Sequence, residues 1–262
     1  MPSTDYEGNV DFRSLLRSGP PPIGTIVSVS STEVAEVLVA SGFDWLFIDL
    51  EHGALDVGDA QRLLQAASGS TPSLIRIPEN SDVWIKKTLD LGCDGVIVPQ
   101  VNTAEQARAV VASAKYPPLG RRSVGVGRAQ GYGLAFKEYI DSANDATTIV
   151  VQIESIAAVE AIDSILAVEG VDAVFVGPYD LSGSLNRLGD VDHADVQGAI
   201  VEVLRACKSR GVPVGVFAMT ALTGRGMLEQ GFDFLAVGID MPLLASAAKS
   251  ALSDLRGGSR DV

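Results

Sequence analysis

Two carboxylates close two apolar segments of the type that forms buried parallel strands. Glu154 ends one segment, and Asp180 ends the other. Chains built from repeated strand and helix units carry their chemistry at such strand ends. Two carboxylates leave most of an octahedral shell to water and a chelating substrate, as Mg²⁺ or Mn²⁺ prefers. We therefore predict a divalent cation at Glu154 and Asp180, with helix capping or pairing with an arginine as the alternative.

A histidine and an arginine follow two earlier strand-like segments. His52 ends one of them, and Asp49 or Glu51 would hold its imidazole and raise its basicity for work as a general base. Asp49 alternates onto the interior face, so it is the better candidate. Arg76 follows another apolar run, where a guanidinium would stabilise negative charge on an oxygen. The alternatives are a structural histidine and a structural ion pair of Arg76.

Other polar residues divide between this site and the surface. Gln152 lies two residues before Glu154, on the same strand face, and is expected to donate to the same substrate. The second histidine, His193, lies in a polar helix approach and is expected at the surface. The glycine-rich segment 117–146 is too long for an ordinary connection, which favours a functional loop. It holds arginines that could bind a distal carboxylate or phosphate, or remain solvated: Arg121, Arg122 and Arg128.

Strand-like and helix-like segments alternate along the chain. The predicted strands cover residues 23–28, 45–50, 74–77, 95–99, 148–153, 173–176, 212–217 and 234–237. The first predicted helix follows a Ser30/Glu33 capping box. The next six cover residues 56–67, 81–91, 103–114, 157–168, 195–210 and 221–230, and the last helix begins near Pro242. This order predicts a single (β/α)₈ TIM barrel domain over 1–262, with 1–21 as a polar N-terminal arm. A doubly wound open sheet is the alternative.

Composition excludes several classes of protein. The chain has 262 residues, 47% of them apolar, which suffices for a large core. A net charge of −13 disfavours nucleic acids and anionic membranes as partners. No segment approaches the roughly 20 apolar residues of a membrane span, and we expect a cytoplasmic protein. Cys93 and Cys207 lack metal-ligand spacing and are expected to be buried and reduced.

Several of these segments together resemble one family, the HpcH/HpaI class II pyruvate aldolases, such as the 2-dehydro-3-deoxyglucarate and 4-hydroxy-2-oxoheptanedioate aldolases. They are residues 43–53 (FDWLFIDLEHG), 76–80 (RIPEN), 89–92 (LDLG), 152–155 (QIES) and 176–181 (VGPYDL). The likeness extends from about Ile23 to Ala251, in the same order and spacing. Each motif alone is weak, but together they are specific.

The resemblance implies a barrel of the phosphoenolpyruvate/pyruvate superfamily type and assigns roles to the strand-end residues. Glu154 and Asp180 would be the Mg²⁺ or Mn²⁺ ligands. His52 would be the base, paired with Asp49, and Arg76 would stabilise the enolate oxygen. These implied roles agree with the chemistry inferred above from the residue types.

The resemblance also implies further contacts. Gln152 and the backbone at Tyr179 and Asp180 would contact pyruvate. Asp90 matches a family aspartate that reaches the histidine of a neighbouring subunit, in a homo-oligomer (trimer or hexamer) with an exchanged C-terminal helix. Ser123 and Tyr179 depart from the small residues usual in relatives, so the acceptor aldehyde is not fixed by the resemblance.

The predicted reaction is a reversible aldol cleavage of a 4-hydroxy-2-oxo acid to pyruvate and an aldehyde. His52 would take the proton of the C4 hydroxyl while the metal and Arg76 stabilise the enolate. No lysine lies at these strand ends, which disfavours a Schiff base. The alternatives are a CoA-thioester lyase of the citryl-CoA or malyl-CoA type and a non-catalytic 2-oxo acid binding protein.

Overall fold

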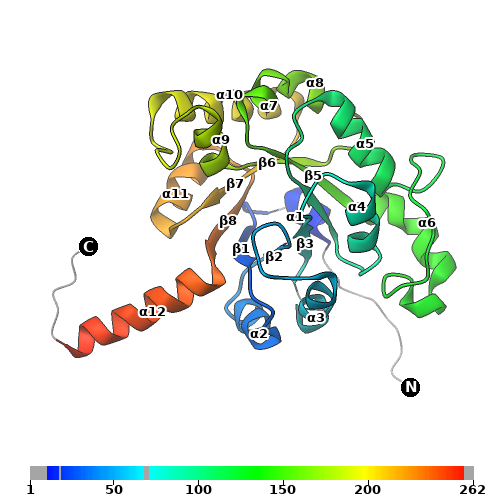
Figure 1. Cartoon of the computed structure of the whole chain (residues 1–262), viewed down its shortest axis with the longest axis horizontal. Coiled ribbons are helices and arrows are strands. Elements are labelled where there is room, and N and C mark those ends of the chain that lie inside the picture. Colours follow the sequence, from blue (N-terminus) through cyan, green and yellow to red (C-terminus); the bar gives the residue numbers. More distant parts are fainter. Residues whose placement is uncertain (1–10, 18, 68–70, 257–262) are drawn as a thin grey trace.

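Eight parallel strands close into a barrel in the computed structural model, which describes residues 11–17, 19–67 and 71–256 (Figure 1). Each strand pairs with the next, and β8 pairs with β1. The strands are β1 Ile23–Val27, β2 Trp45–Asp49, β3 Ser73–Arg76, β4 Gly95–Val98, β5 Thr148–Ile153, β6 Ala173–Val176, β7 Val214–Ala218 and β8 Phe234–Ile239. The predicted TIM barrel is therefore confirmed, and the open sheet is wrong.

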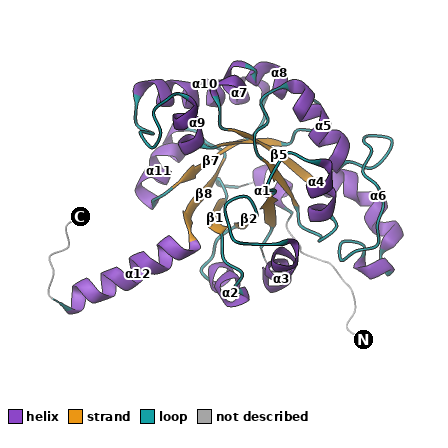
Figure 2. Ribbon diagram, in the orientation of Figure 1, coloured by secondary structure: helices purple, strands orange, loops and turns teal. Residues whose placement is uncertain are grey.

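Helices surround most of this barrel (Figure 2). Most follow a strand and bury one apolar face against the outer side of the sheet. They are α2 Thr32–Ala40, α3 Val57–Ala67, α4 Asp82–Leu89, α5 Ala104–Ala114, α6 Phe136–Ala146, α7 Ile156–Glu160, α8 Ile162–Leu166, α9 Pro178–Ser184, α10 Ala194–Arg210, α11 Ala221–Gln230 and α12 Asp240–Leu255. No helix of the described residues is long and apolar enough to cross a membrane.

A short helix, α1 (Phe12–Arg17), lies within the predicted N-terminal arm and closes the barrel at the amino ends of the strands. Phe12 is fully buried, with its ring centroid 5.0 Å from that of Trp45 and 5.5 Å from that of Phe234. Burial of this ring explains why residues 12–17 fold onto the barrel instead of forming an extended lead-in. Residues 1–10 and 18 of the predicted arm lie outside the described residues.

Three predicted elements differ in detail. Ser31, not Ser30, caps α2, because its hydroxyl is the one that accepts from the N–H of Val34, at 3.3 Å. The predicted helix over 157–168 is two helices, α7 and α8, separated at Ala161. The segment 117–146 is not a continuous loop, since it contains a 3₁₀ turn (Gly131–Gly133) and α6.

Four Gly-x-Asp sequences repeat one arrangement at the amino ends of the strands. Each aspartate precedes an even-numbered strand and accepts from a backbone N–H at the start of the preceding odd-numbered strand, at 2.8–2.9 Å. Its own N–H donates back to the carbonyl of the same residue. The glycines all have positive φ, which a side chain would strain. The aspartates are Asp44, Asp94, Asp172 and Asp233.

Inside the barrel, aromatic residues form the layer beneath the strand ends. Trp45 and Phe234 are accommodated by glycines on the neighbouring strands: a Cβ on Gly24 would lie 2.4 Å from the indole, and one on Gly215 2.3 Å from the phenyl ring. Side chains alternate along a strand, so the residue two positions after Phe47 faces the same interior. That residue is Asp49, and the polar strand ends therefore rest on an apolar floor.

Cysteines and the second histidine take structural positions. Cys93 and Cys207 are free thiols, the first partly and the second fully buried, and burial raises the pKa of each to about 12. His193 is partly exposed and caps α10, where its Nδ1 accepts from the N–H of Asp195 at 3.2 Å. Neither cysteine is in the state of an activated nucleophile.

Candidate active site

Arg76 and Asp49 form a buried ion pair at the ends of β2 and β3. The two residues are partners in the register of these strands. Arg76 Nε and Nη2 donate to the two carboxylate oxygens of Asp49 at 2.9 and 2.7 Å, and both residues are at least 92% buried. The Phe47 ring lies beneath, 5.1 Å from the guanidinium carbon. This bidentate geometry fixes the plane of the guanidinium.

The third nitrogen of this guanidinium, Nη1, makes no hydrogen bond with the described residues. Because Asp49 holds the other two nitrogens, Nη1 is presented in a fixed direction at the carboxyl end of the barrel. A guanidinium nitrogen oriented in this way suits a substrate oxygen on which negative charge develops.

The turn after β2 wraps around Asp49 and carries His52. One oxygen of Asp49 also accepts from the backbone N–H groups of Glu51 and His52, at 3.0 and 3.3 Å. The His52 Nε2 atom lies 3.7 Å from the carboxylate of Glu51, and its side chain is 64% exposed. The structure does not bring the side chains of His52 and Asp49 together within this chain: Asp49 binds Arg76 and the backbone, and Glu51, the other acid considered from the sequence, lies near the imidazole.

Glu154 is the most perturbed acid of this cluster. It is 2% exposed; one oxygen accepts from the backbone N–H of Gln100 at 2.7 Å and the other from the side-chain amide of Gln152. Burial, together with the negative charges of Glu51 and Asp180, raises the pKa of Glu154 to about 7. The hydrogen bond from Gln100 and the charge of Arg76 oppose this shift without cancelling it.

Asp180 lies in the first turn of α9 and is exposed. Its side chain makes no capping hydrogen bond and no ion pair with the described residues, so neither alternative role proposed for it from the sequence is seen. Its charge acts on both Glu154 and Glu51, which places the three carboxylates in one electrostatic cluster. Burial likewise raises the pKa of Glu51, against the influence of Arg76.

The residues present fit a hard divalent cation. The three acids of the cluster are Glu51, Glu154 and Asp180, and the one arginine among them, Arg76, is already paired with Asp49. The buried Gln152 Oε1 has no hydrogen-bond partner among the described residues. All of these donors are oxygens, which Mg²⁺ and Mn²⁺ prefer. No group of three or more acidic, histidine or cysteine side chains in the described chain has the geometry of a complete metal site. Glu154 and Asp180 would thus leave coordination positions for a substrate.

Gln100 is a residue of this cluster that the sequence did not reveal. It follows β4, and its left-handed φ of 55° turns its backbone N–H toward Glu154. The signal in the sequence was a polar residue directly after Pro99 at a strand end. A donor that belongs to the backbone gives no side-chain pattern, so this contact required the structure.

Asp90 lies apart from these groups. Helix α4 runs from the carboxyl end of β3 back to the amino end of β4, so Asp90 at its end is remote from the strand-end cluster of the same chain. Its Oδ1 accepts from Arg122 Nη2 at 2.7 Å. Ser123 lines a cavity with that arginine, whereas Tyr179 lies beside Asp180, with its ring 6.4 Å from Phe217.

Comparisons with known proteins agree with this geometry. The sequence model of the HpcH/HpaI aldolase/citrate lyase family matches residues 23–247. The chain is 40% identical to a 2-dehydro-3,6-dideoxy-6-sulfogluconate aldolase of Pseudomonas putida, over 93% of this chain and 96% of that protein. It is also 40% identical to a 2-keto-3-deoxy-L-rhamnonate aldolase of Salmonella gallinarum, over 92% and 91%.

A solved structure extends the agreement to three dimensions. A crystal structure of an HpcH/HpaI aldolase/citrate lyase family protein from Burkholderia cenocepacia J2315 superposes with a TM-score of 0.90. The two sequences are 35% identical, and the match covers 93% of this chain and 98% of that one. With the closed barrel and the acidic strand ends, these matches establish that the chain belongs to the HpcH/HpaI aldolase/citrate lyase family.

Proposed function

We propose that this chain is a carbon–carbon lyase that cleaves a 4-hydroxy-2-oxo acid to pyruvate and an aldehyde. The observation that carries the proposal is the guanidinium of Arg76, fixed by Asp49 with Nη1 left for a ligand, beside the acidic cluster of Glu154. Two relatives that are 40% identical over almost the whole chain are named as aldolases, which supports the same reaction.

Arg76 stabilises the charge that the reaction creates. As the bond between C3 and C4 breaks, its electron pair passes into an enolate, and negative charge develops on the 2-oxo oxygen. The Nη1 donor of Arg76 binds that oxygen more strongly as the charge grows, which lowers the barrier. Asp49 keeps the guanidinium in place, so the donor need not reorganise during the reaction.

His52 is the proposed base. The C4 hydroxyl loses its proton to the imidazole as C4 becomes the aldehyde carbonyl, and the enolate then takes up a proton at C3 to become pyruvate. In the reverse direction C3 loses that proton, and the imidazolium protonates the C4 oxygen as the new bond forms. Glu51, 3.7 Å from Nε2, stabilises the protonated ring. The large exposure of His52 leaves this ring accessible to the distal part of a substrate.

Glu154 and Asp180 would hold Mg²⁺ or Mn²⁺, and such a cation would supply Lewis-acid polarisation of the 2-oxo group. Gln152 lies on the same strand face as Glu154, and with the backbone at Tyr179 and Asp180 it would orient the pyruvate part of the substrate. Hydrophobic residues below this layer would form an apolar floor for the pyruvate part of the substrate.

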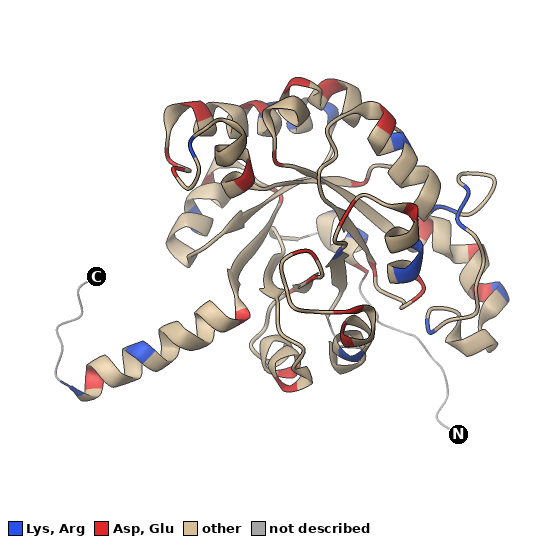
Figure 3. Cartoon of the chain, viewed as in Figure 1, with Lys and Arg blue, Asp and Glu red and all other residues tan. Residues whose placement is uncertain are grey.

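A homo-oligomer, trimer or hexamer, completes the proposal. Helix α12 extends away from the barrel (Figure 1), and residues 241–256 are all exposed although the helix is largely uncharged (Figure 3). Leu244 and Leu252 are 59% and 49% exposed. Exposed apolar surface of this kind marks an association site. A second copy would cover α12, and in that assembly Asp90 of a neighbouring copy would approach His52.

A substrate panel with matched variants tests the proposal. We expect pyruvate from at least one 4-hydroxy-2-oxo acid with Mg²⁺ or Mn²⁺, and loss of turnover with a chelator and in E154Q and D180N. D163N, which neutralises a 75% exposed acid on α8, is the control and should retain activity. Cleavage of CoA thioesters alone would favour the thioester lyase. Binding of 2-oxo acids without any turnover would contradict the enzyme and favour a binding protein.

A further inference from the structure

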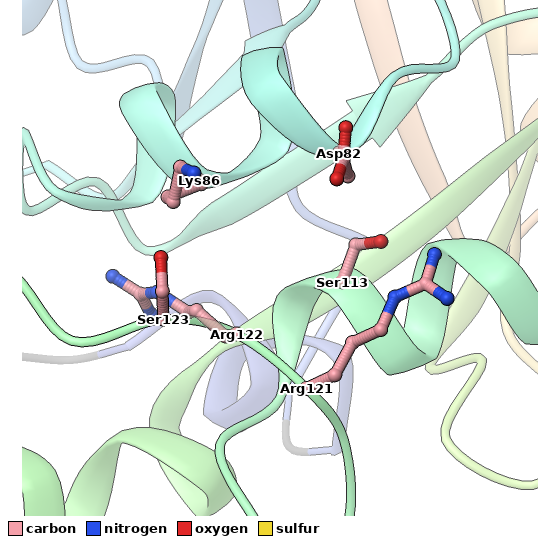
Figure 4. Close-up of a pocket in the computed structure, with 6 residues that line it drawn as sticks. All are labelled: Asp82, Lys86, Ser113, Arg121, Arg122 and Ser123. Carbon is pink, nitrogen blue, oxygen red and sulfur yellow. The ribbon is translucent and has the colours of Figure 1, made fainter.

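A cavity of about 170 Å³ lies outside the strand-end site, between α4, the end of α5 and the segment that follows α5 (Figure 4). Its lining contains none of the acids at the strand ends. The lining residues are Asp82, Lys86, Ser113, Arg121, Arg122 and Ser123. Three cations and two hydroxyls thus line this cavity with a single carboxylate.

Two of these cations are not neutralised by neighbours. The side chains of Lys86 and Arg121 make no ion pair and no hydrogen bond with the described residues. Lys86 is partly exposed and Arg121 is exposed, so both stand where a solute can reach them. Two unpaired positive charges at one cavity are a notable concentration in a chain whose net charge is −13.

Arg122 supplies an independent observation that points to a ligand. Its side chain is 0% exposed, and Nη2 donates to Asp90 at 2.7 Å and to the Tyr139 hydroxyl at 3.1 Å. Its guanidinium carbon lies 4.6 Å from the centre of the Tyr116 ring. Nε and Nη1 are fully buried and have no hydrogen-bond partner in the described chain. Unsatisfied buried donors are unfavourable, and an anion would satisfy them.

We propose that this cavity binds a small oxyanion: phosphate, or the phosphoryl group of an ester. Donors reach the cavity from two guanidinium groups, one ammonium group and two hydroxyls, on three separate segments of the chain. A tetrahedral anion accepts hydrogen bonds in several directions at once, whereas a carboxylate accepts in one plane. Asp82 lies at one side of the lining, near Ser113, so the anion binds nearer to Lys86, Arg122 and Ser123, and Arg121 reaches it from the opposite side (Figure 4).

Titration calorimetry with inorganic phosphate at constant ionic strength tests this site, which does not depend on the proposed function. We expect saturable binding to the metal-loaded protein, weakened about tenfold by K86Q and by R121Q, since each removes a charge-assisted contact. The matched control is K87Q: Lys87 is the next residue of α4, is exposed and does not line the cavity. It should bind phosphate as the wild type does. Arg122 is left intact because its burial ties it to folding.

The remaining outcomes decide the proposal. Absence of saturable binding, or equal affinity in wild type, K86Q and R121Q, would overturn it. Binding that is retained in K86Q and R121Q but lost in R76K would place phosphate at the strand ends and also overturn it. A parallel titration with glycerol 3-phosphate distinguishes the source of the anion. Tighter binding than that of inorganic phosphate identifies the phosphoryl group of an ester, and weaker binding identifies free phosphate.

Discussion

Arg76 shows how one side chain serves both the fold and the proposed chemistry. Two of its nitrogens neutralise Asp49 in a buried setting, and the third remains for a ligand. A lysine places one point charge where arginine places a planar fork. A lysine at position 76 could form an ion pair with Asp49 or donate to a substrate oxygen, but its single ammonium group could not do both as the guanidinium does.

At this residue we predict that R76K lowers kcat by about 10²–10³-fold, the usual effect of losing an oxyanion donor. The fold should persist because a cation still faces Asp49. Pyruvate release and circular dichroism together measure the two effects. R62K is the matched control, since Arg62 is exposed on α3 and pairs with Asp59. Unchanged turnover in R76K would remove Arg76 from the mechanism.

The sequence predicted the residues of the site better than their partners. Glu154 and Arg76 were found because each closes an apolar run, and Asp180 because it follows such a run after three residues; a strand end is a local property of the chain. The pairing of Arg76 with Asp49 depends on the register of β2 against β3, which is not local. For the same reason, the sequence did not decide between Asp49 and Glu51 as the neighbour of His52, and the structure places Glu51 nearer.

At the scale of the elements, the Gly-x-Asp turns join each odd-numbered strand to the next strand. Asp94 does so for β3 and β4, through a 2.8 Å bond from the Ser73 N–H. Burial raises the pKa of Asp94 to about 6, although the Ser73 hydrogen bond lowers it. The carboxyl therefore binds a proton more tightly in the folded chain than in the unfolded chain, whose value is 3.8.

This shift makes the contribution of Asp94 to stability fall as the pH rises through about 6. We predict that D94N, which keeps an oxygen to accept from Ser73, matches the wild type near pH 4. Above about pH 7 it should be more stable by roughly 1–2 kcal/mol, because no buried charge remains. Denaturant unfolding across this pH range measures the difference.

The control for D94N is D44N, which alters the equivalent bond to Ile23 at an exposed aspartate. D44N removes an exposed charge, whereas D94N removes a buried charge. The comparison therefore shows whether the change in stability depends on burial. A stability difference between D94N and wild type that does not change with pH would contradict the assigned cause.

Strands were more predictable than the short helices. Buried parallel strands are continuous apolar runs, so all eight were located to within about two residues. α1 has six residues and is held by the burial of Phe12 beneath the barrel, a tertiary contact that local propensity does not reveal. α6 lies in a glycine-rich segment, and its start at Phe136 was hidden by that composition.

For the whole molecule, α12 is the element that does not belong to the compact barrel. We predict that L244E combined with L252E lowers the mass in sedimentation velocity, because both leucines would place charge in the contact between copies. L222E is the control, since Leu222 is 84% exposed on α11. A monomeric wild type, or an unchanged mass in the double variant, would contradict the proposed assembly.

The order of the elements was enough to predict a closed barrel, because alternating strands and helices leave few topologies. The alternation alone did not predict the direction of α12, since its sequence continues the same pattern; only the family resemblance implied an exchanged C-terminal helix. Likewise, a sequence places Arg121 and Lys86 far apart, and only the packing of α4 against α5 brings them to one cavity.

The four Gly-x-Asp turns also divide the molecule into quarters of equal standing: β1 with β2, β3 with β4, β5 with β6, and β7 with β8. In each quarter, the same two hydrogen bonds join the two strands at their amino ends: one to the carboxylate of the aspartate and one from its backbone N–H. A circular permutant opened before β3, β5 or β7 would keep all four of these pairs of hydrogen bonds, so we expect it to form the same barrel.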